Sequence, residues 1–183
     1  MLKVTSEVDG DALKTSSAIA LGFAGLIPFW TVPFFPLAAG WFGEDVALAV
    51  SQWIVIYAAV IASFMSGGRW AFRIMQPDTR PAAVFGGFLG AVVPALVVWV
   101  IASLPDPLFG MTFGPMAKLF WIAVILILQL FQDDEQALEG GIPGWYMRLR
   151  TMLVIGASTP ILLPIILNTL LAFFTGVAPA AAD

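Results

Sequence analysis

Nineteen consecutive residues, 46–64, carry no charged side chain, and this run most constrains how the chain can fold. An α-helix needs about 20 mostly apolar residues to cross a hydrocarbon core roughly 30 Å thick. The whole chain is 60% hydrophobic and 11% charged, whereas a soluble domain is typically about 45–50% apolar and about 25% charged. A soluble protein of this composition would have too little polar surface to face water. We therefore predict a multi-pass membrane protein.

The uncharged runs predict an all-α fold, a polytopic membrane protein built as a bundle of five transmembrane helices. The predicted spans are residues 17–39, 46–72, 82–104, 116–131 and 149–174. Residues 1–16 are polar and mixed in charge, so we expect a short cytoplasmic arm, with the first helix starting near Ser16 or Ser17. Residues 176–183 are of low complexity and predict a mobile tail outside the cytoplasm.

Prolines fall inside the first and last spans. Pro28, Pro33 and Pro36 lie in the second half of the first span, and Pro160 and Pro164 lie one turn apart in the last. Each proline removes a backbone donor, and each is expected to bend or interrupt its helix. The freed carbonyl groups then need partners from neighbouring helices or water.

Small residues recur at four-residue spacing along the second and third spans. In a membrane such rows let helix backbones approach closely. They favour a tight antiparallel hairpin of these two spans, whereas the fourth span has few small residues and is expected to face more lipid. The residues that we predict to pack helices together are Ala59, Ser63, Gly67, Gly68, Gly86 and Gly90.

The basic residues indicate an orientation. With five spans, seven of the eight Lys and Arg residues share the side of the N-terminus, and Lys118, expected to reach outward, stands alone on the other side. Cytoplasmic loops of membrane proteins carry the excess of basic residues, which predicts a cytoplasmic N-terminus and an external C-terminus. We expect lipid or partner contacts at the cytoplasmic interface from Arg69, Trp70, Arg73, Arg80, Trp145, Tyr146, Arg148 and Arg150.

Candidate chemistry inside the spans is sparse. The chain has no Cys and no His, which excludes disulfides, thiolate nucleophiles and Cys/His zinc sites. No acidic residue is expected deep in the bilayer, because the acidic run 133–139 is placed in a loop, where it pairs either internally or with a partner. Gln129 and Asn168 are expected to form hydrogen bonds between helices. We therefore predict no catalytic residue, cofactor or metal site.

Three motifs resemble an uncharacterised family of bacterial multi-pass membrane proteins that is related to mitochondrial transmembrane protein 69. They are the run from Tyr57 to Trp70 with its Ser-Phe-Met-Ser-Gly-Gly-Arg-Trp end, the segment 145–150 (Trp-Tyr-Met-Arg-Leu-Arg), and the segment 25–29 (Gly-Leu-Ile-Pro-Phe). The resemblance covers nearly all of the chain from the first span to the fifth. It implies a small protein of bacterial inner membranes or mitochondria, and it supplies no activity.

Two functions from different classes fit these observations. The first is a non-catalytic structural, accessory or assembly component that packs against a larger inner-membrane complex, with membrane lipids as further partners and no nucleic acid. The alternative is a small carrier or binder of an apolar molecule, a lipid or a quinone, near the proline-kinked helices. The alternative requires that these helices line a cavity of about 300 Å³ or more.

Overall fold

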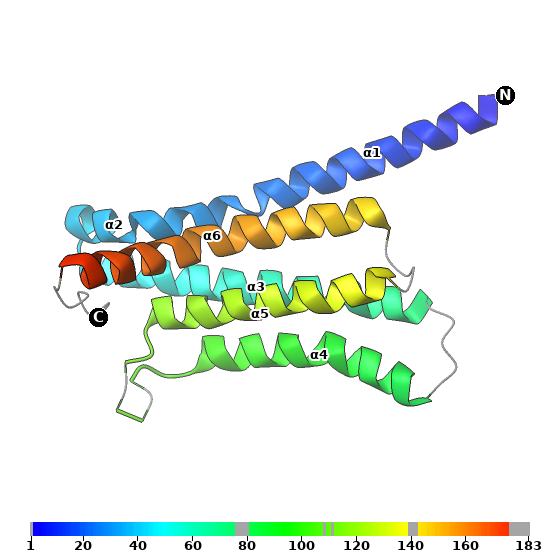
Figure 1. Ribbon diagram of the computed structural model, residues 1–183. Helices are drawn as coiled ribbons and strands as arrows, with labels where there is room; N and C mark the ends of the chain where they lie inside the picture. The colour runs from blue at the N-terminus through cyan, green and yellow to red at the C-terminus, as the bar shows by residue number, and fades with distance from the viewer. Residues whose placement is uncertain (1, 76–80, 108, 111, 139–142, 176–183) are drawn as a thin grey trace.

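The structure is a computed structural model that describes residues 2–75, 81–107, 109–110, 112–138 and 143–175. The described chain is helical apart from its connections, and the helices run back and forth along one direction (Figure 1). In order, the elements are α1 (Leu2–Ala24), the 3₁₀ helix η1 (Ile27–Phe34), α2 (Phe35–Phe42), α3 (Glu44–Met75), α4 (Pro81–Ser103), α5 (Pro115–Leu138) and α6 (Gly144–Thr175).

Within the described parts of the chain, five helical segments are long and apolar enough to cross a membrane, which confirms the predicted fold class. They are Ala12–Phe42, Glu44–Met75, Val84–Ser103, Pro115–Asp134 and Gly144–Thr175. The fourth extends beyond its predicted end at residue 131, because α5 continues through the first acidic residues to Leu138. These residues were expected in a loop, and that expectation is wrong for Asp133, Asp134 and Glu135.

The first span consists of three pieces, as its prolines predict. Helix α1 ends at Ala24, η1 carries Pro33 inside it, and α2 completes the crossing as far as Phe42. The predicted start of the helix near residue 16 is wrong, because α1 already begins at Leu2. Continuing an existing helix adds one hydrogen bond per residue fixed, whereas starting a helix is costly. The predicted tail, residues 176–183, lies outside the described residues.

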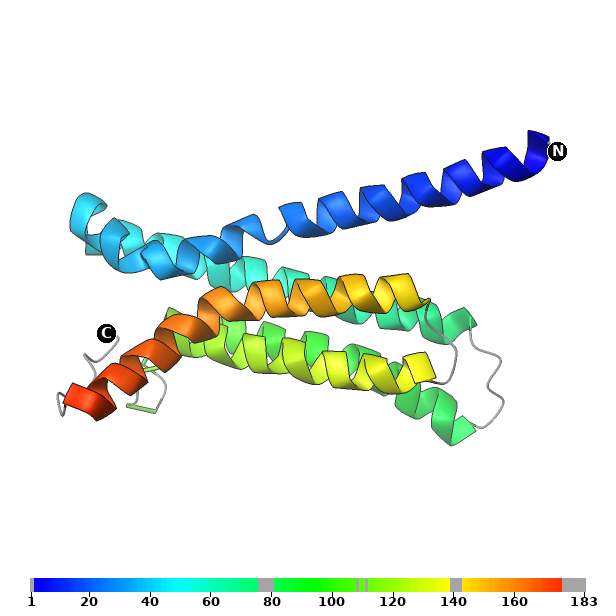
Figure 2. The ribbon, with the colours of Figure 1, turned by 45° about the horizontal axis from the view of Figure 1, so that its top comes forward.

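Helix α3 occupies the centre of the bundle. It packs against α4 and α5 and also against the broken first span, while α6 lies across α5 and η1 (Figure 2). The extensive α3–α4 contact confirms the predicted hairpin of the second and third spans. Helix α1 leans away from this bundle toward its N-terminal end (Figure 2).

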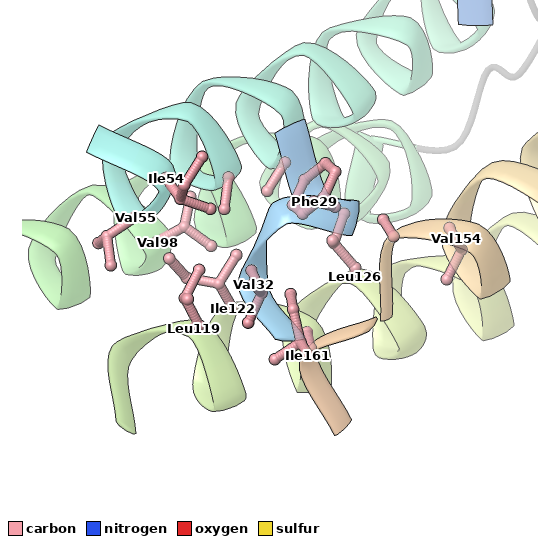
Figure 3. Close-up of a cluster of buried hydrophobic side chains, with 14 of the residues drawn as sticks. Phe29, Val32, Ile54, Val55, Val98, Leu119, Ile122, Leu126, Val154 and Ile161 are labelled. Atoms are coloured by element: carbon pink, nitrogen blue, oxygen red, sulfur yellow. The ribbon is translucent and has the colours of Figure 1, made fainter. Parts of the chain in front are cut away.

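Apolar side chains from five elements meet in the middle of the bundle (Figure 3). On α5, Leu119, Ile122 and Leu126 are fully buried, and this span is buried as much as the second, so the expectation that the fourth span faces more lipid is wrong. Small residues such as Ala58 and Ala62 on α3 leave room for the larger α5 side chains. The labelled members of this core are Phe29, Val32, Ile54, Val55, Val98, Leu119, Ile122, Leu126, Val154 and Ile161.

Candidate functional site

Three charged side chains meet inside the bundle: Arg69 of α3, Asp133 of α5 and Arg150 of α6. We call them the charge cluster. Arg69 Nε donates to Asp133 Oδ1 over 2.6 Å, and Arg150 Nε pairs with Asp133 Oδ2. The residues are 1%, 0% and 2% exposed, respectively. One carboxylate therefore holds two guanidinium groups from two other helices.

Helical spacing turns all three side chains inward. Arg69 continues the buried row of Ala58, Ala62 and Ser66 on α3, with steps of three or four residues. Asp133 continues the row of Ile122, Leu126 and Gln129 on α5, and Arg150 begins the row of Val154, Ala157 and Ile161 on α6. Residues three and four apart share one face of a helix, so each charge lies on the face that its helix buries.

Arg69 joins three helices through its remaining donors. Nη1 donates to Gly90 O of α4 over 2.8 Å, and Nη2 donates to Gln129 O over 3.0 Å and to Gln132 Oε1 over 2.7 Å. With the bond to Asp133, four of its five N–H donors are used. Away from water each unmet donor is costly, so these bonds fix how α3, α4 and α5 lie against one another.

Arg150 is bonded less completely than Arg69. Nη2 donates to Met65 O over 2.9 Å, and Nη1 donates to Tyr146 Oη, one turn earlier on α6, over 3.0 Å. Together with the ion pair to Asp133, three of its five donors have partners among the described residues. Arg150 also lines a cavity, which Arg69 does not.

The cavity has a volume of about 420 Å³ and lies between α1, α3 and α6. Its wall is almost entirely apolar, and Tyr146 and Arg150 supply polar groups at one end. Other lining residues include Gly22, Phe29, Ile61 and Leu153. An engineered apolar cavity of about 150 Å³ suffices to bind benzene, so the space here is large enough for a chain-like apolar molecule.

Beside this cavity, the first span and α6 come into close contact at two glycines. A Cβ atom at Gly156 of α6 would lie 2.5 Å from Leu26 Cδ1, and one at Gly22 of α1 would lie 3.1 Å from Leu153 Cδ1. The first span therefore approaches α6 closely near the break at Gly25 and Leu26 and diverges from it on the N-terminal side (Figure 2).

The residues predicted to pack helices together have mixed outcomes. Ala59 and Ser63 are half-buried, but Gly67 and Gly86 are exposed, and a Cβ atom at either would meet nothing within 4 Å. For Gly67 and Gly86 the prediction is wrong for contacts within the chain, because the neighbouring row of Ala58, Ala62 and Ser66 is the buried one.

Two of the six residues predicted to pack helices together, Gly68 and Gly90, contact other helices without packing two backbones against each other. A Cβ atom at Gly68 would lie 2.8 Å from Tyr146 Oη, so Gly68 makes room for the side chain of α6. A Cβ atom at Gly90 would meet nothing within 4 Å, but the carbonyl group of Gly90 accepts a hydrogen bond from Arg69.

Among the residues predicted at the cytoplasmic interface, Arg69 and Arg150 are placed wrongly. Both are buried in the charge cluster, because both lie on inward faces of their helices. Trp70, Trp145 and Arg148 are exposed, and their contacts to lipid or partner stay a prediction.

The remaining interface residues lie around this end of the bundle. Tyr146 is half-buried beside Arg150. Arg73 is also half-buried, and its guanidinium group lies against Gly87 of α4, where a side chain would overlap with it. Arg80 is outside the described residues.

The sequence interpretation missed Asp133, Gln132 and the inward direction of the two arginines. The sequence left open whether the acidic run pairs internally or with a partner. Asp133 pairs internally, with Arg69 and Arg150.

Lys118 also differs from expectation: it is buried and donates to Leu104 O over 2.6 Å. Gln129 forms a bond between helices as predicted, to Ala62 O over 3.4 Å. Among the described residues, no group of three or more acidic side chains is placed to hold a metal ion.

This architecture defines a small multi-pass α-helical membrane protein with a buried charge cluster and an apolar cavity. The chain belongs to a protein family of unknown function, DUF3429, whose model matches residues 15–166. Transmembrane protein 69 of Xenopus tropicalis is 32% identical over 152 residues, which cover 81% of this chain and 54% of the relative. The chain thus spans about half the length of this curated relative. No solved structure gives a significant match. The predicted family resemblance is confirmed.

Proposed function

We propose that this protein binds a lipid-like molecule between its broken first span and α6. The observation that carries the proposal is the cavity of about 420 Å³, which exceeds the volume that the binder hypothesis requires and is lined by those two proline-interrupted spans. Ligand sites are typically apolar clefts of about 300–1,000 Å³ with a few polar groups that fix orientation. Tyr146 and Arg150 are such groups here.

The proposed role is non-catalytic. The polar groups at the cavity wall are a phenol and a guanidinium group that is paired with Asp133. A guanidinium group stays protonated in proteins and serves as a hydrogen-bond donor. Such a wall supports recognition of a ligand, and the proposal assigns no bond-breaking step, cofactor or metal to it.

We place the protein in the bacterial inner membrane with its N-terminus in the cytoplasm. The support for this orientation is the distribution of basic residues, seven of eight on the side of the N-terminus. The family resemblance supports the choice of membrane. In this orientation Tyr146 and Arg150 lie toward the cytoplasmic leaflet.

A second candidate function is an accessory component of a larger membrane complex. The exposed small residues Gly67 and Gly86 favour it, because they leave an outer face that the backbone of another helix could approach closely. In this reading the partner is a membrane protein and not a nucleic acid. Co-elution of one partner protein in constant stoichiometry, lost on Gly67→Leu, would support this candidate.

Native mass spectrometry of the full chain, purified in a gentle detergent, tests the binding function. Leu153→Trp places an indole in the cavity and should reduce the lipid that stays bound by about tenfold, equivalent to roughly 1.4 kcal/mol. Met152→Trp adds the same indole at the adjacent exposed position and should leave retention unchanged. Equal retention by both folded variants would contradict the proposal.

A further inference from the structure

We infer that the molecule bound in the cavity is an anionic phospholipid of the surrounding bilayer, with one acyl chain in the apolar part and its phosphate at Arg150 and Tyr146. This inference rests on the proposed binding function and specifies the ligand. Three independent features carry it: the charge of the cluster, the unused donors at the cavity wall, and the depth at which the polar groups lie.

The charge cluster carries one positive charge in excess. The ion pairs that the described residues make at Arg69 and Arg150 both end on the single carboxylate of Asp133. An uncompensated charge removed from water is costly, and a nearby opposite charge offsets that cost. A phosphate next to Arg150 would supply the second negative charge.

The unused donors lie on Arg150 and Tyr146, both of which line the cavity. Arg150 has two N–H groups beyond the three that bond described residues. Tyr146 Oη accepts a bond from Arg150, and none of the described residues accepts its hydroxyl proton. Arginine N–H groups bind phosphate oxygens in strong, charge-assisted hydrogen bonds. Arg69 uses four of its five donors within the bundle and is not part of the cavity wall.

The depth of these groups matches a lipid in its normal orientation. Arg150 follows the start of α6 at Gly144 by six residues, or about 9 Å at 1.5 Å per residue, near the headgroup end of a crossing helix. Beyond Arg150 the lining of α6 is apolar and continues to Ala157, seven residues or roughly 10 Å deeper. A phosphate at the shallow end and a chain along the deep end therefore follow the direction of neighbouring lipids.

The test is a competition between two lipids with identical chains, phosphatidylglycerol and phosphatidylcholine, offered in equal amounts to the full chain in detergent. Native mass spectrometry gives the ratio of the two lipids retained. Both lipids carry the phosphate, so they differ at this site in the choline cation, which offsets the negative charge that Arg150 pairs with. We therefore expect the unmodified protein to favour the anionic lipid about tenfold. Arg150→Gln, which leaves Asp133 paired with Arg69, should bring the ratio near one.

Arg148→Gln is the matched control, because it removes the same charge two residues away, at an exposed position that does not line the cavity, and any lipid contact of Arg148 is therefore outside the proposed site. Tyr146→Phe keeps every ion pair but removes a hydroxyl donor for the phosphate, so it should lower the retention of phosphatidylglycerol about threefold. It decides the question if Arg150→Gln does not fold. Equal retention of both lipids by the unmodified protein would overturn the inference and leave the binding function standing. An equal loss of preference in Arg148→Gln and Arg150→Gln would also overturn it. Retention unaffected by Leu153→Trp would instead overturn the proposed function itself.

Discussion

At the scale of single residues, Asp133 determines how three helices meet. Its two oxygens bind arginines from α3 and α6, and the rest of Arg69 bonds the backbones of α4 and α5. These side chains are at most 2% exposed, so water does not satisfy their donors. The partners must come from the protein or, for the two unused donors of Arg150, from the proposed ligand. The cluster therefore specifies the relative position of the helices more sharply than apolar contacts can.

Asp133→Asn tests this role. The change keeps the size of the side chain but leaves two buried guanidinium groups without a counter-charge. Breaking a buried ion pair by removing one partner costs about 3–5 kcal/mol, and we expect a loss of that order in the free energy of unfolding in detergent. Asp134→Asn, at the adjacent exposed position, should change it by less than about 0.5 kcal/mol. Indistinguishable unfolding curves for the two variants would contradict a structural role for the cluster.

At this scale the sequence singled out Arg69 and Arg150 but gave both the wrong environment, and it missed Asp133 as their partner. Counting along a helix places Arg69 about 9 Å from the end of α3, and an arginine there can equally reach the interface or turn inward. The deciding signal is the row Ala58, Ala62 and Ser66, which Arg69 continues. The sequence did not indicate a buried Asp133, because an acidic run ordinarily predicts a loop. Only the packing of α5 shows that its first member lies on the buried face.

At the scale of the element, the broken first span is what makes the cavity. Prolines predicted the interruption, and the structure places it from Gly25 through η1. The sequence could not show which helix faces the break, because that depends on the contact of Leu26 with Gly156 of α6. The predicted cavity near the kinked spans is present, but its location beside Arg150 followed only from the structure.

Paired cysteines can test the contact between the first span and α6. The natural chain has no Cys, so Leu26→Cys with Gly156→Cys introduces the only two thiols. A Cβ atom at Gly156 would lie 3.6 Å from Leu26 Cγ, which is close enough for a disulfide after a small adjustment. Mild oxidation should therefore shift nearly all of the protein to the cross-linked form on a denaturing gel. The pair Leu26→Cys with Ile155→Cys, whose second position is exposed, should stay reduced; the reverse pattern would contradict the arrangement.

At the scale of the whole molecule, composition alone was enough to predict the class of fold. Uncharged runs of spanning length predicted five crossings, and the described residues contain five helices that are long and apolar enough to cross a membrane. What composition could not provide is the order of the helices around α3, since every crossing is apolar enough to face either lipid or protein. That order is fixed by the charge cluster and by a few close contacts, such as those of Gly68 and Gly156.

An odd number of crossings makes the orientation testable at a single point. Helix α1 begins at the end of the bundle opposite to the end of α6 (Figure 1), so the two termini are expected on different sides of the membrane. Because seven of the eight basic residues lie on the N-terminal side, that side should be cytoplasmic. Alkaline phosphatase, which is active only outside the cytoplasm, should be active when fused after Asp183, and green fluorescent protein at the same position should be dark. Fluorescence without phosphatase activity would reverse the orientation, and the anionic lipid would then be expected in the opposite leaflet, since Arg150 lies near the start of α6.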